Sequence, residues 1–226
     1  MKHSYEVEIK TLLGSKKNAE KLKRDLSKRF PGIKMISAGR QLNHYFNLPA
    51  DLEPLRRALA DIIPADQRSR CEEIVTRGTK ISLRSRQTDN QVLLVMKASV
   101  GDDTSSNGVK RMEFEVPVEK TLDELDTVLL DAGCTYQAKW SRERQEYAAE
   151  DMHVCIDRNA GYGYLAEFER VTEDQSRLDD IRRELANVMN VLGLSELPQD
   201  RLERMFAHYN SHWQEYYGTE KTFTIE

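Results

Sequence analysis

The chain has 226 residues, of which 32% are charged and 39% hydrophobic, so it can bury a sizeable core. Its formal net charge of −4, from 34 basic and 38 acidic side chains, argues against general nucleic-acid binding, which needs a basic excess. No apolar run approaches the ~18 residues of a membrane span, so no membrane contact is expected. The three cysteines form no CxxC pair, which predicts neither a disulfide framework nor a zinc site and favours a reducing cytoplasm.

The first predicted strand is the stretch from Tyr5 to Lys10. Charged and apolar residues alternate there, so Glu6, Glu8 and Lys10 would share one face of the strand. Two carboxylates and an ammonium group on one face are costly to bury unless they are compensated. A divalent cation on the glutamates and an anion on the lysine would compensate them, whereas the alternative is a solvated face of an edge strand.

The rest of the chain alternates between helical and extended patterns, read from apolar periodicity and from turn residues. After the first strand, the expected elements in chain order are a helix at 15–30, an extended segment at 34–46, an inserted helical segment at 48–77, a hairpin of strands 80–86 and 92–98 turning at Asp89-Asn90, a strand at 111–116, a helix from Thr121 to Gly133, an extended segment at 136–148, strands at 154–157 and 164–171, and helices at 176–192 and 199–217.

Several of these strands repeat the charged-and-apolar alternation. Any single strand of this kind also fits a sheet with one face in water. The sorting of the charges into Glu pairs and Arg or Lys pairs favours a different α+β fold: a sheet closed on itself into a barrel, with the charges inside and helices packed outside. Such an interior needs occupants, and a triphosphate bridged by Mg²⁺ or Mn²⁺ supplies both the cations and the anion.

The charged segments resemble the CYTH family, also called triphosphate tunnel metalloenzymes. Glu6-Val7-Glu8-Ile9-Lys10 is similar to the family's ExExK signature, and the resemblance extends over about residues 5–192. It implies a closed antiparallel eight-stranded tunnel in one domain of residues 1–226, with a helical insertion at about 48–77 and a C-terminal helical extension at about 198–226. The further segments that carry it are Tyr45-Phe46, Leu83-Arg84-Ser85-Arg86, Lys97, Arg111-Met112-Glu113-Phe114-Glu115, Arg142-Glu143-Arg144 with Tyr147, Cys155-Ile156-Asp157 and Glu167-Phe168-Glu169.

The resemblance also implies roles for individual residues. Metal binding is expected of Glu6, Glu8 and Glu169, with Glu167 and Asp157 near the metals or their waters. Glu113 and Glu115 would bind metal or balance neighbouring bases, and a balancing role is also open for Glu167. Triphosphate binding is expected of Lys10, Arg84, Arg86, Lys97, Arg111 and Arg144. Arg142 stands where the family commonly has a lysine, and an arginine does not readily give up a proton; Lys139 and Tyr45 are therefore the further catalytic candidates beside Arg142.

The function that follows is a metal-dependent hydrolase of inorganic, thiamine or nucleoside triphosphates, using one or two Mg²⁺ or Mn²⁺ ions. The first alternative is a class IV adenylyl cyclase, which the same family contains, and the second is a non-catalytic polyphosphate- or nucleotide-binding module. An RNA 5′-triphosphatase is disfavoured by the net negative charge. The expected partner is a small triphosphate, and the oligomeric state is left open, a homodimer included.

Overall fold

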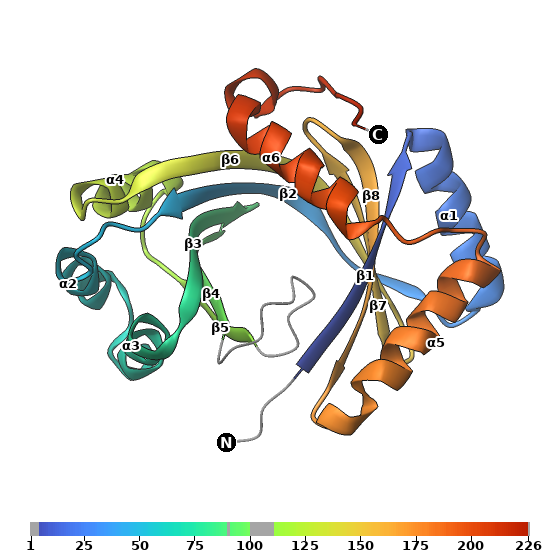
Figure 1. Ribbon diagram of the computed structural model, residues 1–226, viewed down its shortest axis with the longest axis horizontal. Coiled ribbons are helices and arrows are strands. Elements are labelled where there is room, and N and C mark those ends of the chain that lie inside the picture. Colours follow the sequence, from blue (N-terminus) through green and yellow to red (C-terminus); the bar gives the residue numbers. More distant parts are fainter. Residues whose placement is uncertain (1–4, 90, 100–110, 226) are drawn as a thin grey trace. The chain divides into compact units, whose positions relative to one another are not determined.

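The computed structural model describes residues 5–89, 91–99 and 111–225, except the side chains of residues 99, 111–113 and 175 (Figure 1). Eight strands form one antiparallel sheet in the order β1-β8-β7-β6-β2-β3-β4-β5. The strands are β1 (Tyr5–Gly14), β2 (Lys34–Asn47), β3 (Thr79–Thr88), β4 (Gln91–Ser99), β5 (Arg111–Pro117), β6 (Thr135–Ala149), β7 (Met152–Asn159) and β8 (Gly163–Thr172). The α-helices within the described residues are α1 (Lys16–Arg29), α2 (Glu53–Ile62), α3 (Arg68–Arg77), α4 (Leu122–Asp131), α5 (Leu178–Val191) and α6 (Gln199–Tyr216).

The predicted α+β fold with eight antiparallel strands is confirmed, whereas the closed barrel is not. The sheet begins at β1 and ends at β5, and no pairing joins these two strands among the residues that the structure describes. The chain divides into two compact units, one of Met1–Arg40 with Arg142–Glu226 and the other of Gln41–Ser141. The long strands β2 and β6 contribute residues to both units.

The first unit packs α1 and α5 against the apolar face of β1. Ser15 caps α1, because its side chain accepts a hydrogen bond from the backbone N–H of Asn18. Val7 and Ile9 of β1 are buried in one cluster with the apolar residues of both helices, and Figure 1 shows the two helices on the same side of this strand. Since side chains alternate along a strand, the charged residues of β1 lie on the opposite face, as the sequence predicted.

The second unit covers its sheet with α2, α3 and α4. Thr121 and Glu124 form a capping box that starts α4. Leu83 of β3, Met96 of β4 and Phe114 of β5 are buried in one cluster with the apolar stripes of the three helices. The predicted hairpin at Asp89 is confirmed, because Thr88 and Gln91 pair across it; Asn90 lies outside the described residues.

Across the described ranges, no helix is both long enough and apolar enough to cross a lipid bilayer.

Candidate functional site

Three carboxylates converge on one face of β1 and β8 in the first unit. Glu8 lies directly opposite Glu169, and Lys10 lies opposite Glu167, in the register of the two strands. Side chains opposite each other on one sheet face have Cβ atoms about 5 Å apart, so these groups interact. One carboxylate oxygen each from Glu6, Glu8 and Glu169 lies within 4.8 Å of the others. We refer to these three residues as the carboxylate trio.

The negative charge of the carboxylate trio is only partly compensated. Burial, followed by the neighbouring Glu6 carboxylate, raises the pKa of Glu169 to about 8. A carboxyl group responds in this way when its ionisation would bring two like charges together away from bulk water. A divalent cation would remove this penalty, and carboxylate oxygens are the donors that Mg²⁺ and Mn²⁺ prefer. The donor set of the trio therefore fits a hard divalent cation.

Lys10 lies between the carboxylate trio and a second acidic residue of β8. Its Nζ is 2.6 Å from a Glu8 oxygen and 3.6 Å from a Glu167 oxygen. Burial acts to lower the pKa of Lys10, but the two carboxylates outweigh burial and raise it. Burial likewise acts to raise the pKa of Glu167, but Lys10 and Arg144 outweigh it and lower that pKa to about 2. Both groups are therefore charged at neutral pH.

Two arginines of β6 hold the remaining acidic residues on this face. Arg144 donates to Asp157 Oδ1 at 2.8 Å and Oδ2 at 2.7 Å, and to Glu167 Oε2 at 2.6 Å. Arg142 donates to Asp157 Oδ2 at 2.9 Å. Asp157 is 1% exposed, so its charge depends on these guanidinium groups. The structure thus gives Asp157 and Glu167 basic partners, and their placement near a metal stays a prediction.

The second unit brings together another part of the predicted site. Arg84 lies opposite Tyr45 and donates from Nη1 to the tyrosine hydroxyl at 2.7 Å, with the guanidinium carbon 5.1 Å from the ring centroid. Arg84 is only 8% exposed, and among the side chains and backbone that the structure describes its Nε has no hydrogen-bond partner. A buried donor without a partner costs free energy, so this nitrogen fits an anionic oxygen that a ligand would supply.

Other predicted phosphate-binding residues lie on the same sheet face as Arg84. Arg86 donates to Asn43 Oδ1 and to Glu115 Oε2, both at 2.9 Å. Lys97 lies on β4, opposite Ser82 of β3 and Glu113 of β5. The side chains of Arg111 and Glu113 lie outside the described residues, so their predicted roles are not examined by the structure.

Lys139 contacts a buried aspartate that sequence reasoning missed. Its Nζ lies 3.7 Å from Asp126 Oδ2 and 4.1 Å from the centroid of the Tyr136 ring. Asp126 accepts hydrogen bonds from Tyr136 at 2.6 Å and from Ser85, and its Oδ2 is 2.6 Å from His44 Nδ1. Ser85 alternates with Arg84 along β3, so this network lies on the helix-covered face. A signal existed: Asp126 interrupts the apolar stripe of its helix.

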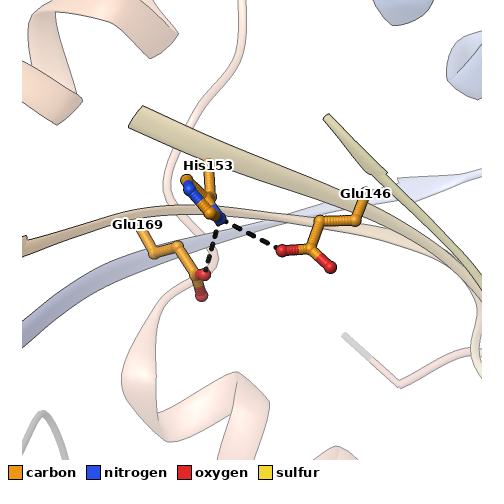
Figure 2. A group of neighbouring side chains, drawn as sticks. All are labelled: Glu146, His153 and Glu169. Atoms are coloured by element: carbon orange, nitrogen blue, oxygen red, sulfur yellow. Dashed lines mark hydrogen bonds and ion pairs between the residues drawn. The ribbon is translucent and has the colours of Figure 1, made fainter. Parts of the chain in front are cut away.

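The structure places a histidine beside the carboxylate trio (Figure 2). His153 of β7 lies opposite Glu169 of β8. Its Nδ1 is 3.1 Å from Glu146 Oε1 of β6 and 3.9 Å from Glu169 Oε1. The sequence contained a signal, because His153 and Asp157 share one face of a strand at even spacing. The partner carboxylates could not be identified without the register of three strands.

Comparison with known proteins relates this geometry to a family. The CYTH domain model matches residues 4–201, whereas a search of curated proteins found no match. Among solved structures, the PH1819 protein of Pyrococcus horikoshii OT3 is similar at 16% identity over 90% of this chain and 99% of that protein, with a TM-score of 0.62. A Vibrio parahaemolyticus protein, provisionally described as an adenylate cyclase, is similar at 15% identity over 90% of this chain and 98% of its own, with a TM-score of 0.59.

A third similar structure comes from Hippeastrum. It is described as a candidate adenylyl cyclase with a dominant triphosphatase activity, and it is similar at 16% identity over 92% of this chain and 96% of its own, with a TM-score of 0.50. At such low identity these structures establish the fold and not the reaction. The family match spans most of the sequence and includes the carboxylate trio, Arg142, Arg144 and Arg84. The chain belongs to the CYTH domain family.

Proposed function

We propose that the protein is a metal-dependent hydrolase of triphosphate substrates, with inorganic triphosphate, thiamine triphosphate and nucleoside triphosphates as the first candidates. The observation that carries the proposal is the carboxylate trio, with Lys10 beside it on the same strand face. A group that binds a cation next to a group that binds an anion is suited to a metal-bound polyphosphate. The Hippeastrum structure, described as having a dominant triphosphatase activity, supports the same substrate class.

Glu6, Glu8 and Glu169 would hold the first Mg²⁺ or Mn²⁺. When bound, such an ion neutralises phosphate charge and lowers the pKa of a coordinated water. Lys10 would bind a phosphate oxygen close to the ion, since the two neighbouring carboxylates keep its ammonium group charged. Together these residues would fix one end of the triphosphate chain.

The basic residues predicted to bind triphosphate would bind the remaining phosphates. Arg84 would donate its buried Nε–H to a phosphate oxygen, with Arg86, Lys97, Arg111 and Arg144 supplying further positive charge. The proposal includes closure of the sheet into a barrel with the charged faces inside. Of the catalytic candidates, Tyr45 accepts a hydrogen bond from Arg84 through its hydroxyl oxygen, which would keep this hydroxyl close to a phosphate that Arg84 binds.

The second candidate function is an adenylyl cyclase that converts ATP to cyclic AMP and pyrophosphate. One feature favours it: the Tyr45 and Trp140 rings lie 6.2 Å apart beside Arg84, and aromatic side chains can stack on a base. The two functions differ in the bond that breaks. A hydrolase releases orthophosphate or pyrophosphate from several triphosphates, whereas a cyclase requires ATP and forms a cyclic nucleotide.

The test is a panel of triphosphates incubated with Mg²⁺, Mn²⁺ or Co²⁺, with phosphate, pyrophosphate and cyclic AMP measured separately. We expect metal-dependent phosphate release that is abolished in Glu6→Gln and Glu8→Gln, and retained in the control Glu143→Gln, which changes an exposed residue of β6. Cyclic AMP as the main product would favour the cyclase. Tight triphosphate binding without turnover under any metal would favour a binding module, and full activity of both variants in excess EDTA would contradict the proposal.

A further inference from the structure

The His153 imidazole lies between two carboxylates, that of Glu146 and that of Glu169, and Glu169 also belongs to the carboxylate trio. Figure 2 shows the His153 ring between Glu146 and Glu169, with Nδ1 as the shared contact atom. One ligand atom from each of the three residues lies within 4.8 Å of the others. Ligand atoms that share one ion, with bonds of about 2.1 Å, lie about 3 to 3.5 Å apart. The distance of 3.1 Å from His153 Nδ1 to Glu146 Oε1 already matches, and the distance of 3.9 Å from His153 Nδ1 to Glu169 Oε1 is slightly longer.

The backbone and an outer hydrogen bond hold this group in place. His153 and Glu169 are register partners on β7 and β8, and both strands belong to the first unit. Glu146 is oriented by Ser37 of β2, whose hydroxyl donates to Oε2 at 3.1 Å, while Oε1 faces the imidazole. An outer-shell hydrogen bond to the far oxygen of a carboxylate is the arrangement that orients metal ligands.

The charges nearby are unbalanced at this end of the face. Among the described residues, His153 is the only ion-pair partner of Glu146 and of Glu169. In contrast, Asp157 and Glu167 are held by arginine side chains and by Lys10. To bind a metal ion, Asp157 and Glu167 would have to break these ion pairs with arginine side chains. Glu146 and Glu169 would not.

We propose that His153, Glu146 and Glu169 form a second divalent-cation site, which takes Mn²⁺ or another transition ion in preference to Mg²⁺. An imidazole ligand favours transition ions, because Mg²⁺ strongly prefers oxygen. Glu169 would bridge this ion and the ion on Glu6 and Glu8. The His153 side chain is 44% exposed, which leaves an entry path from solvent. The part that the second ion plays in catalysis rests on the proposed function, but its binding does not.

The test is pulsed electron paramagnetic resonance of the untagged, metal-stripped protein loaded with Mn²⁺, together with a titration of bound Mn²⁺. We expect two bound ions and a nitrogen hyperfine coupling, which only a histidine ligand would give here. His153→Gln should abolish the coupling and weaken the second ion at least about tenfold, since even an outer-shell partner changes affinity by about 10–100-fold. The control His212→Gln changes an exposed residue of α6 and should keep both the nitrogen coupling and the affinity for the second ion.

A second pair of variants covers the case in which His153→Gln does not fold. Glu146→Gln should also weaken the second ion, whereas Glu143→Gln on the same strand should not. A wild-type spectrum without nitrogen coupling, or a coupling that survives in His153→Gln, would overturn the inference. If the second ion shows the nitrogen coupling but the protein hydrolyses no triphosphate, the second cation site is supported and the proposed function is contradicted. If the protein shows metal-dependent hydrolysis but no nitrogen coupling, the proposed function is supported and the second cation site is contradicted.

Discussion

The Arg84 guanidinium donates to the Tyr45 hydroxyl at 2.7 Å, and in the same side chain Nε is buried and has no hydrogen-bond partner within the described part of the chain. The tyrosine ring also faces the guanidinium carbon at 5.1 Å. One side of the arginine is therefore fixed by an aromatic residue, while a buried N–H remains available to a ligand. A side chain preorganised in this way binds an oxyanion without a large loss of conformational entropy.

Arg84→Lys should weaken triphosphate binding more than a conservative charge exchange suggests. Lysine keeps the charge but not the planar set of donors, and a hydrogen bond to a charged group contributes about 1.5–3 kcal/mol. We expect KM to rise by about 10- to 100-fold. Steady-state kinetics would measure this, with Arg183→Lys on the surface of α5 as the control. An unchanged KM in Arg84→Lys would show that Arg84 does not bind the substrate.

Glu8→Gln should weaken binding of the first cation by about 100-fold or more, because a direct ligand contributes at least as much as an outer-shell partner, whose loss costs about 10–100-fold. At a concentration of 100 times its dissociation constant, an ion stabilises the folded state by about 2.7 kcal/mol. The wild type should therefore show a rise in melting temperature on addition of Mn²⁺ that Glu8→Gln loses. Equal shifts in both proteins would place the cation elsewhere, and Glu143→Gln serves as the matched control.

Asp126→Asn should destabilise the protein through the buried network of α4. The carboxylate accepts hydrogen bonds from Ser85 and Tyr136 and faces His44, and breaking a buried network of this kind costs about 3 kcal/mol. Chemical denaturation would measure the loss, with the exposed Asp131→Asn of the same helix as the control. A loss below about 0.5 kcal/mol, the usual range for surface changes, would contradict a structural role for the network.

The same aspartate gives a pH dependence of stability. Burial acts to raise the pKa of Asp126, but its hydrogen bonds to His44, Ser85 and Tyr136 outweigh burial and lower it from the ordinary value of 3.8. The unfolded chain thus takes up this proton at a higher pH than the folded protein does. The stabilisation is complete above the ordinary pKa and is lost as pH falls through the lowered one. Asp126→Asn should remove this part of the acid sensitivity in denaturation experiments between about pH 2 and 5; an identical acid slope in both proteins would contradict it.

Gly161→Ala should disturb the C-terminal helix where it packs on the β7–β8 turn. A Cβ at Gly161 would lie 2.5 Å from an atom of the buried Tyr209 ring, and the backbone there has φ +89°. Gly193, with φ +69° and no atom of the described residues within 4 Å of its Cβ position, is the matched control. Gly193→Ala should lower the free energy of unfolding by about 1–2 kcal/mol through backbone strain alone. Gly161→Ala should lower it by about 2 kcal/mol more through overpacking. Equal losses in denaturation would mean that the tyrosine moves aside.

The local pattern of the sequence determined which residues share a strand face. Alternation has a period of two and is a property of the backbone alone, so the faces of Glu6, Glu8 and Lys10, and of Arg84 and Arg86, could be predicted without any partner strand. Helix starts and ends followed from equally local signals, such as Ser15 and the capping box of Thr121. The family resemblance rested on the order of the charged segments, and the match of the CYTH domain model over residues 4–201 confirmed the family.

Which charges neutralise one another was decided only by tertiary structure. Pairing depends on register between strands far apart in the sequence, which periodicity does not encode. For this reason the sequence did not show that Arg142 and Arg144 hold Asp157, nor which carboxylates lie beside His153. Local patterns state which face a side chain occupies, whereas the electrostatic partner that gives it a role is set by the pairing of distant strands.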